Sequence, residues 1–431
     1  MDIRKMVDVK RFFNVDLKRK GHISVTVVLL IAMVMAVGLL AGCGKQVDSG
    51  ASQEQVDNSG RQEQTDNSNS GSVSSTQNEM GDDSGENSLG NAENITGIAD
   101  NSGDNEVGNN NGSNAGVSDS GAGGNSSGSS SSGNGSGGLR VSGTNLTDAS
   151  GNIVQLRGVS THGLAWFPQY VNKEAFVTLR DDWGANVVRL AMYTEEYGGY
   201  CNGGDREALE QLIDDGVNYA AELGMYVIID WHILSDGNPN QNKEEAKAFF
   251  TKMSSKYAGY GNVIYEICNE PQNSDWNSQI KPYASEVIAC IRANAPDALI
   301  LVGTNNWSQD IDAVIGNKLD DENVMYVLHF YAGTHKEWLQ DKMLKALNAG
   351  VPVFVSECSI CDASGNGGID YDSADKWVDV LNSNNISFLA WSLCNKNETS
   401  ALIRPDCAKL SGWTEDDLSE TGRWFRNAIR N

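Results

Sequence analysis

From Leu139 onward, short apolar runs rich in Val and Ile alternate with stretches in which apolar residues recur every three or four positions. Near-continuous apolar runs are typical of strands covered on both faces, as in parallel sheets, and the longer period predicts amphipathic helices. Eight strands are expected, at residues 153–159, 186–192, 225–230, 263–268, 299–302, 324–329, 351–356 and 387–391. Six helices are expected between them, at residues 173–183, 205–222, 242–257, 276–294, 336–348 and 373–382.

Eight strand–helix units in this length predict an α/β fold of the (β/α)8 TIM-barrel class over residues 139–431. A doubly wound open sheet is the main alternative. That fold typically has a Gly-rich phosphate-binding turn after the first strand, and the segment from Arg157 to His162 is not such a turn. Residues 139–152 read as a small hairpin that closes the bottom of the barrel.

The N-terminus resembles an export signal rather than part of a fold. Lys18, Arg19 and Lys20 precede an almost uncharged apolar run over 23–40, which ends in Leu-Ala-Gly-Cys43. This ending resembles a bacterial lipoprotein signal, which implies cleavage before Cys43 and a lipid on that cysteine. An uncleaved anchor helix is the alternative, because the run is long enough to span a bilayer. In both cases residues 1–43 place the rest of the chain outside the cytoplasm, on the outer face of the cell membrane.

Residues 44–138 are dominated by Ser, Gly, Asn, Asp and Gln, with almost no large apolar side chains. Such a segment cannot bury enough surface to fold, so we expect a flexible tether. It holds 14 acidic and 2 basic residues, about half of the excess behind the net charge of −25. The remaining acidity argues against nucleic-acid binding and suits an uncharged substrate.

Seven cysteines remain once Cys43 is assigned to lipid, and an odd number leaves one unpaired in a monomer, the state that we expect. Cys358 and Cys361 have CxxC spacing, but no second CxxC or suitably spaced His accompanies them. Packing or a disulfide explains this pair better than a metal site. We expect no metal and no cofactor.

Polar and aromatic residues gather where the expected strands end, which is where a TIM barrel forms its active site. Taken alone, a carboxylate at a strand end is ordinarily a helix cap or a surface charge. Glu270 and Glu357, however, follow the fourth and seventh runs, so they face each other across the barrel mouth. Such a pair suits hydrolysis of an acetal, with one carboxyl protonated as the acid and the other ionised. A retaining pair should lie roughly 5 to 5.5 Å apart, and an inverting pair roughly 6.5 Å or more.

Several stretches resemble glycoside hydrolase family 5, particularly its bacterial endo-β-1,4-glucanases. They are Leu156-Arg-Gly-Val-Ser-Thr-His162, Val188-Arg189-Leu, Asp230-Trp-His232, Tyr265-Glu-Ile-Cys-Asn269-Glu270-Pro, His329-Phe-Tyr331, Ser356-Glu357 and Ala390-Trp391. Cys268 and Cys358 depart from the family pattern. The resemblance implies a retaining barrel enzyme with Glu270 as general acid/base and Glu357 as nucleophile.

The same matching implies three groups of sugar-binding residues. At the cleaved bond are Arg189, His232, Asn269, His329, Tyr331 and Trp391; on the donor side are His162, Trp166, Tyr193, Lys396 and Glu398; on the acceptor side Trp276 is a possible platform. The expected substrate is cellulose or mixed-linkage β-glucan. Mannan, xyloglucan or xylan is an alternative, since loops select the sugar on a shared core. A barrel that binds polysaccharide without cutting it is a third reading, but it predicts loss of one carboxylate, and both are present.

Overall fold

The computed structural model of this protein describes residues 138–431. The expected signal ending at Cys43 and the expected linker up to residue 137 lie outside the described residues. Within 138–431, no helix combines the length and the apolar character needed to cross a membrane.

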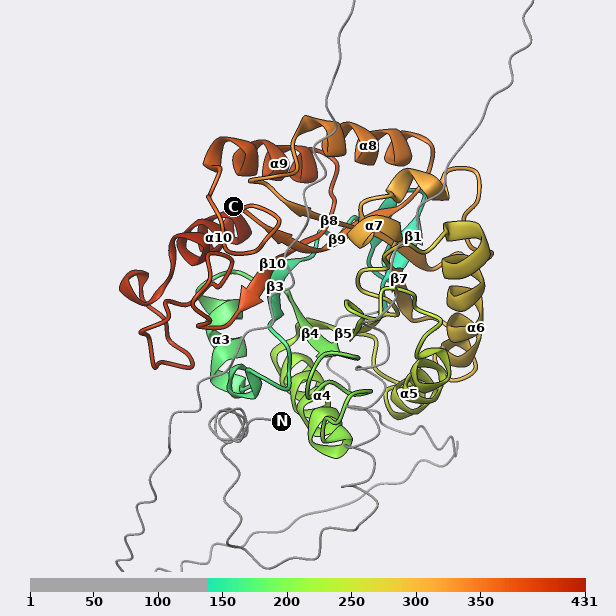
Figure 1. The fold of residues 1–431 in the computed structure, drawn as a ribbon, viewed down its shortest axis with the longest axis horizontal. Coiled ribbons are helices and arrows are strands. Elements are labelled where there is room, and N and C mark those ends of the chain that lie inside the picture. The colour runs from blue at the N-terminus through green and yellow to red at the C-terminus, as the bar shows by residue number, and fades with distance from the viewer. Residues whose placement is uncertain (1–137) are drawn as a thin grey trace, which may run out of the picture. The chain divides into compact units, whose positions relative to one another are not determined.

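Eight parallel strands close into a barrel in the order β10-β3-β4-β5-β6-β7-β8-β9, so the last strand pairs with the first (Figure 1). This confirms the (β/α)8 barrel and all eight expected strands. Their bounds are β3 Arg157–Thr161, β4 Val187–Tyr193, β5 Tyr226–His232, β6 Val263–Glu266, β7 Leu299–Val302, β8 Val324–Tyr331, β9 Val353–Ser359 and β10 Phe388–Leu393.

Two strand boundaries differ from the expectation, and the second of them matters for the site. The first strand begins at Arg157 rather than at Ile153, which is 53% exposed and pairs back with Thr147. The fourth ends at Glu266, so Asn269 and Glu270 lie in the turn beyond it.

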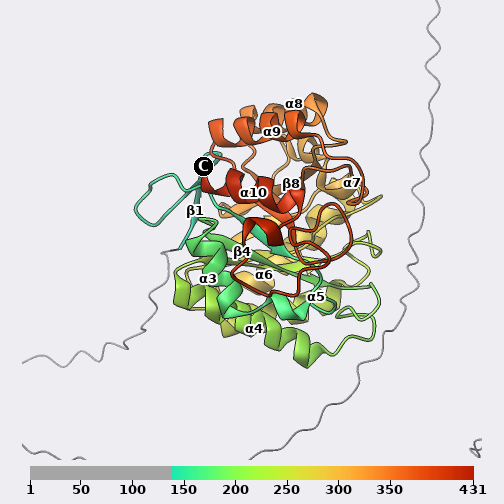
Figure 2. The same ribbon diagram turned by 90° about the vertical axis from the view of Figure 1, so that its left-hand side faces the viewer.

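Helices surround the barrel (Figures 1 and 2), as expected for strands that are apolar on both faces. They are α3 Lys173–Asp181, α4 Arg206–Leu223, α5 Lys243–Lys256, α6 Lys281–Arg292, α7 Asn305–Ser308, α8 Glu337–Asn348, α9 Tyr371–Ser383 and α10 Glu420–Arg430. The expected helix over 276–294 is divided into a π-helical turn, Trp276–Ile280, and α6. The sequence interpretation missed α10, whose N-terminus is capped by Ser419.

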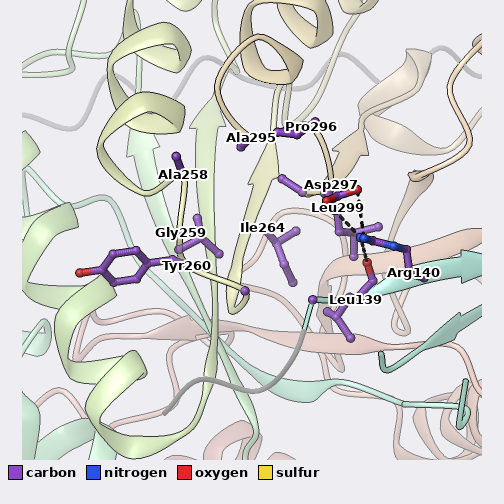
Figure 3. A pocket seen from close by; sticks show the side chains of 14 residues that line it. Leu139, Arg140, Ala258, Gly259, Tyr260, Ile264, Ala295, Pro296, Asp297 and Leu299 are labelled. Carbon is purple, nitrogen blue, oxygen red and sulfur yellow. Dashed lines mark hydrogen bonds and ion pairs between the residues drawn. The ribbon is translucent and has the colours of Figure 1, made fainter. Parts of the chain in front are cut away.

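The hairpin expected over 139–152 is present as β1 Arg140–Ser142 and β2 Asn145–Thr147, which pair antiparallel. Leu139 and Leu146 are buried against the first residues of the barrel strands, including Val187 and Tyr226. The hairpin therefore closes the bottom of the barrel, as predicted. A cavity of about 340 Å³ lies beside it, bordered by the Arg140–Asp297 ion pair (Figure 3), and contains none of the predicted site residues.

Candidate active site

The predicted site residues lie at the carboxyl ends of the strands, at the opposite end of the barrel from the hairpin. Tyr193 and His232 are the last residues of β4 and β5, and Tyr331 is the last residue of β8. Glu357 lies near the end of β9, directly opposite His329 of β8 in the strand register. The parallel register thus brings side chains far apart in sequence to one end of the barrel.

The two predicted catalytic carboxylates are close neighbours. One oxygen of Glu270, one of Glu357 and a ring nitrogen of His329 all lie within 4.8 Å of one another. Oxygens this close are compatible with a retaining pair, whose carboxyl groups lie roughly 5 to 5.5 Å apart, rather than with an inverting pair at roughly 6.5 to 9.5 Å. Both carboxylates are buried, at 8% and 4% exposure.

Arg189 links the predicted nucleophile to the wall of the barrel. Its guanidinium group is fully buried and donates to Glu357 Oε2 at 3.2 Å, while two further N–H groups hold both oxygens of Glu266, at 2.8 and 3.2 Å. It also donates to Asn269 Oδ1 at 2.6 Å and lies 3.0 Å from Asp230 Oδ2. These contacts fix Glu357 and Asn269 relative to each other.

The surroundings of the two carboxylates differ in the number of donors. Glu357 accepts from Tyr331 Oη at 2.7 Å as well as from Arg189, and both contacts favour its ionised form. Within the described residues, the carboxyl group of Glu270 hydrogen-bonds to a single side chain, with 2.8 Å between its Oε1 and His329 Nδ1. The proton that the pair shares is therefore better placed on Glu270.

Burial raises the pKa of Glu270 to about 7, opposed by the positive charge of Arg189. Burial also raises the pKa of Glu357, and the nearby charge of Glu270 adds to that rise, whereas His329, Arg189 and Tyr331 act against it. Two buried carboxyl groups at this distance titrate as a pair, so one holds a proton near neutral pH.

His232 and Asn269 are held in fixed orientations beside this pair. His232 Nδ1 lies 2.6 Å from Asp230 Oδ2, and burial lowers the pKa of His232, so the neutral ring donates from Nδ1. Its Nε2 then accepts from the amide group of Asn269 at 3.2 Å. Because Arg189 occupies the Asn269 carbonyl oxygen, the amide orientation is also determined.

Three of the predicted donor-side residues, His162, Trp166 and Tyr193, form an aromatic cluster with Trp391. Trp391 stacks on His232 with ring centroids 5.2 Å apart, and Trp166 packs on Tyr193 at 4.6 Å while remaining 37% exposed. His162 lies 5.3 Å from the Trp391 ring and 3.9 Å from Glu398, which pairs with Lys396 at 2.7 Å. The structure therefore brings all five donor-side residues together around Trp391.

Trp276 requires a correction. Its side chain is only 2% exposed, its indole N–H donates to the carbonyl of Asn317, and its ring packs edge-on against Tyr326. A platform for a pyranose ring needs an open aromatic face. Trp276 is a core residue, and the prediction of an acceptor-side platform there is wrong.

All seven cysteines in the described residues are free. Cys358 is buried and directs its Sγ to the carbonyl of Leu389, while Cys361 contacts the Ser359 hydroxyl. The CxxC pair is therefore explained by packing rather than by a disulfide. Between residues 138 and 431, two groups of side chains have ligand atoms within metal-binding reach of one another: Glu270, His329 and Glu357, and His162, Cys394 and Glu398. Both consist of residues that lie around the predicted sugar site.

The motifs of the sequence contain Asp230, Glu266 and Ser356, for which no role was predicted. Asp230 and Glu266 occupy paired positions of β5 and β6 and are fully buried beside Arg189. The sequence did contain a signal for Asp230 and Glu266. An ionisable residue inside an apolar strand needs a partner of opposite charge, and Arg189 is a cation inside another strand. Ser356 gave no signal, because a buried serine is unremarkable until its hydrogen-bond partners are known.

Comparisons with known proteins agree with this geometry. A family model described as cellulase (glycosyl hydrolase family 5) matches residues 147–397. An endoglucanase of Clostridium saccharobutylicum is 47% identical over 294 residues, covering 68% of this chain and 64% of the relative. Endoglucanase A of Butyrivibrio fibrisolvens is 48% identical over 295 residues, covering 68% of each chain. This chain thus spans about two thirds of the length of these relatives.

Among solved structures, the catalytic domain of an endoglucanase from Thermobifida fusca is 35% identical, with a TM-score of 0.65 over 68% of this chain and 98% of that domain. A variant of that domain, solved in complex with cellotetraose, is 36% identical, with a TM-score of 0.64 over the same shares.

Proposed function

Since this chain belongs to the cellulases of glycosyl hydrolase family 5, we propose that it cuts internal β-1,4-glucosidic bonds of cellulose or mixed-linkage β-glucan with retention of configuration. The observation that carries the proposal is the close pair of buried carboxylates, one held by two donors and the other by a neutral imidazole. The names of the relatives and the cellotetraose bound to a similar domain support the choice of glucan.

In the first step a carboxylate oxygen of Glu357 attacks the anomeric carbon while Glu270 gives its proton to the departing glycosidic oxygen. The bond from carbon to that oxygen breaks as the bond to Glu357 forms. In the second step Glu270 takes a proton from a water molecule, the water oxygen attacks the same carbon, and Glu357 leaves. Two inversions at one carbon give net retention.

The neighbouring residues act on the charges that change during these steps. Arg189 and Tyr331 stabilise the carboxylate of Glu357 before attack and after release. Asn269 is held next to Glu270 by Arg189, His232 and the carbonyl of Ile233, which use its amide oxygen and both of its amide hydrogens. Trp166, which is 37% exposed, offers a face on which a donor-side glucose ring stacks.

The test compares reducing-sugar release from carboxymethyl-cellulose, barley β-glucan, glucomannan and xylan by the wild type and by Glu357→Ala. Release from the two glucans, abolished in the variant and kept in the exposed control Glu322→Ala, is the expected result. Release from glucomannan or xylan instead would move the substrate to those polymers. No release from any of the four would favour a binding barrel.

Azide separates the roles of the two carboxylates. With a dinitrophenyl cellobioside, Glu357→Ala should recover turnover in azide and give the α-glycosyl azide, because the anion attacks from the vacated nucleophile side. Glu270→Ala should give the β-glycosyl azide, because azide replaces water in the second step. An exchange of these two products would reverse the assignments.

We also propose that the chain is a monomeric lipoprotein held at the outer face of the cell membrane through Cys43. The motif Leu-Ala-Gly-Cys at residues 40–43 and the polar segment after it support this proposal. Cys43→Ser should abolish the incorporation of a labelled fatty acid that the wild type takes up. Wild-type protein that stays in membranes without taking up the label would favour an uncleaved anchor, and light scattering of residues 44–431 would test the monomeric state.

A further inference from the structure

Behind the two carboxylates, an uninterrupted series of hydrogen bonds connects Glu270 with Arg189. Glu270 Oε1 lies 2.8 Å from His329 Nδ1, and the other ring nitrogen, Nε2, lies 3.0 Å from Ser356 Oγ. Ser356 Oγ in turn lies 2.7 Å from Glu266 Oε1, and both oxygens of Glu266 accept from Arg189. The direction of each bond follows from the chemistry at the Glu266 end.

Glu266 acts as an acceptor in this series. Burial raises the pKa of Glu266, and Arg189 opposes that rise through its charge and its hydrogen bonds. Two N–H groups of one guanidinium on the two oxygens of a carboxylate form the paired arrangement that favours the ionised form. An ionised carboxylate has no hydrogen to give, so the bond to Ser356 must use the serine proton.

The hydrogen bond between Ser356 and His329 can therefore run in one direction only, from His329 to Ser356. A hydroxyl group has a single hydrogen and two lone pairs. With its hydrogen donated to Glu266, the Ser356 oxygen can only accept from His329 Nε2. The ring must then carry a hydrogen on Nε2.

The opposite nitrogen of His329 decides the state of Glu270. Burial lowers the pKa of His329 to about 4, so the ring is neutral at ordinary pH and carries one hydrogen. That hydrogen is on Nε2, so Nδ1 offers a lone pair to Glu270. A contact of 2.8 Å between this lone pair and Glu270 is a hydrogen bond only when the carboxyl group carries the proton.

We propose that Ser356, held by Glu266, is a positioning residue that fixes the tautomer of His329 and thereby keeps on Glu270 the proton given to the leaving oxygen. This inference rests on the proposed function, because it specifies how the assigned acid stays loaded. Ser356 contacts neither sugar nor reacting atoms in the mechanism above and acts through His329 alone.

The reverse arrangement is disfavoured by the same contacts. A His329 ring protonated on Nδ1 would donate to an ionised Glu270 and would need the Ser356 hydrogen at Nε2. The Ser356 oxygen would then face Glu266 Oε1 at 2.7 Å with lone pairs on both atoms. Two facing acceptors at this distance repel each other unless Glu266 gives up its pairing with Arg189 and takes a proton.

The other ionisable groups around this series come from every adjoining strand. The charges of Glu357 of β9, Arg189 of β4 and Glu266 of β6 all shift the pKa of His329. Arg189 and Glu266 also shift the pKa of Glu270, and Glu270 shifts that of Glu357. The remaining ionisable neighbours do not hydrogen-bond to Ser356; they are Tyr193 of β4, Asp230 and His232 of β5, Cys268 after β6, Tyr331 of β8 and Cys358 of β9. A change confined to Ser356 therefore alters the tautomer without removing a charge.

The first test is the pH dependence of kcat/KM for Ser356→Ala on a cellobioside whose leaving group needs protonation. Without the Ser356 hydroxyl group, the His329 tautomer is no longer fixed. The ring can then donate from Nδ1 to an ionised Glu270, which lowers the pKa of Glu270. Activity is lost as pH rises through that pKa, so the alkaline limb should move to lower pH by about one unit, with the acidic limb in place. Ser356→Thr, which keeps the hydroxyl group, should restore the limb.

Ser359→Ala is the matched control, because Ser359 is buried in the same strand and its hydroxyl hydrogen-bonds, among the described residues, only to the thiol of Cys361. Its profile should equal that of the wild type. A dinitrophenyl cellobioside, whose leaving group needs no proton, should show no alkaline shift in Ser356→Ala. An unchanged alkaline limb in an active Ser356→Ala enzyme would overturn the inference. Failure of the proposed function would appear differently, as a wild type without glucanase activity.

Nitrogen NMR of the histidine-labelled wild type tests the tautomer directly, whatever the variants do to folding. The His329 signals, assigned by their loss in His329→Asn, should show hydrogen on Nε2 and a bare Nδ1. A wild-type ring with its hydrogen on Nδ1 would overturn the inference without bearing on the hydrolytic activity.

Discussion

Arg189 is a buried cation shared by three carboxylates, those of Asp230, Glu266 and Glu357. A buried charge is tolerated only where partners and hydrogen bonds replace its lost hydration. Here Glu266 and Asp230 anchor the guanidinium to the barrel wall, which leaves one of its N–H groups for Glu357. Arg189, which holds the predicted nucleophile Glu357, is therefore itself fixed in position by Glu266 and Asp230.

Tyr331→Phe removes the hydroxyl donor from Glu357 Oε1 and keeps the ring. Without that hydrogen bond the pKa of Glu357 should rise, since the bond favours the ionised form. Glu357 must be ionised to attack, so activity is lost as pH falls through its pKa. The acidic limb of kcat/KM should move to higher pH by about one unit.

Tyr265→Phe is the control for that experiment. Tyr265 is buried in β6, and its hydroxyl has no hydrogen-bond partner among the described residues. Its pH profile should match that of the wild type. An acidic limb that stays in place in Tyr331→Phe would mean that the Tyr331 hydrogen bond does not set the charge of Glu357.

At the residue scale, the sequence predicted the two carboxylates well because their position after a strand determines where they lie. It failed at Trp276, where the direction of the side chain depends on a carbonyl from Asn317 in a distant loop. It also left Ser356 without a role, because the partners of that hydroxyl come from β6 and β8. Local sequence contains none of these contacts.

At the scale of elements, the turn after β6 positions Asn269 and Glu270. Gly303, which directly follows β7, packs against this turn. The Gly303 amide donates to the carbonyl of Cys268 at 3.1 Å. A Cβ atom at Gly303 would lie 2.1 Å from that carbonyl oxygen and 2.8 Å from that of Asn269. The turn and β7 can approach this closely only because residue 303 has no side chain.

Gly303→Ala should therefore displace the turn that carries Glu270. We expect kcat to fall about 100-fold, because a shift near 1 Å at a catalytic group has that order of effect. Stability to urea should also fall, by about 1–3 kcal/mol. Gly259→Ala, where a Cβ would meet nothing within 4 Å, should change neither quantity. Wild-type kcat in a folded Gly303→Ala enzyme would contradict this account of the turn.

The periodicity of the sequence predicted the strands and most helices, because barrel strands are apolar on both faces and the helices are amphipathic. It was less accurate at element ends. The segment from Ile153 reads as apolar strand but pairs with the hairpin instead. After β7, a short α7 and a 3-10 turn at Ile311–Val314 stand where other units have a long helix. These outcomes depend on tertiary pairing.

For the molecule as a whole, the contacts that stabilise the closed bottom of the barrel and the residues of the active site lie at opposite ends of the strands. At the bottom, Asn323 connects the hairpin to the strands: its Oδ1 accepts from the Val141 amide at 2.9 Å, and its Nδ2 donates to the carbonyls of Leu139 and Asp297. None of these groups approaches the carboxylate pair.

Asn323→Ala should lower the free energy of unfolding by about 1–3 kcal/mol, because three hydrogen bonds are lost and two carbonyls lose a donor. At temperatures where the variant stays folded, kcat should equal that of the wild type. Urea denaturation and initial rates on barley β-glucan measure the two quantities, with Glu322→Ala as the neighbouring control. A fall in kcat without a fall in stability would mean that the bottom of the barrel influences the site.

The pairing of β10 with β3 has a consequence for how the protein is made. His162 follows the first barrel strand, whereas Trp391 and Glu398 belong to the last strand and the loop after it, and all three meet over this seam. A ribosome that stalls before residue 388 releases a chain that holds both carboxylates but neither the closing strand nor half of the donor-side surface. We therefore expect a chain terminated before β10 to lack the proposed glucanase activity altogether, rather than to be a weaker enzyme.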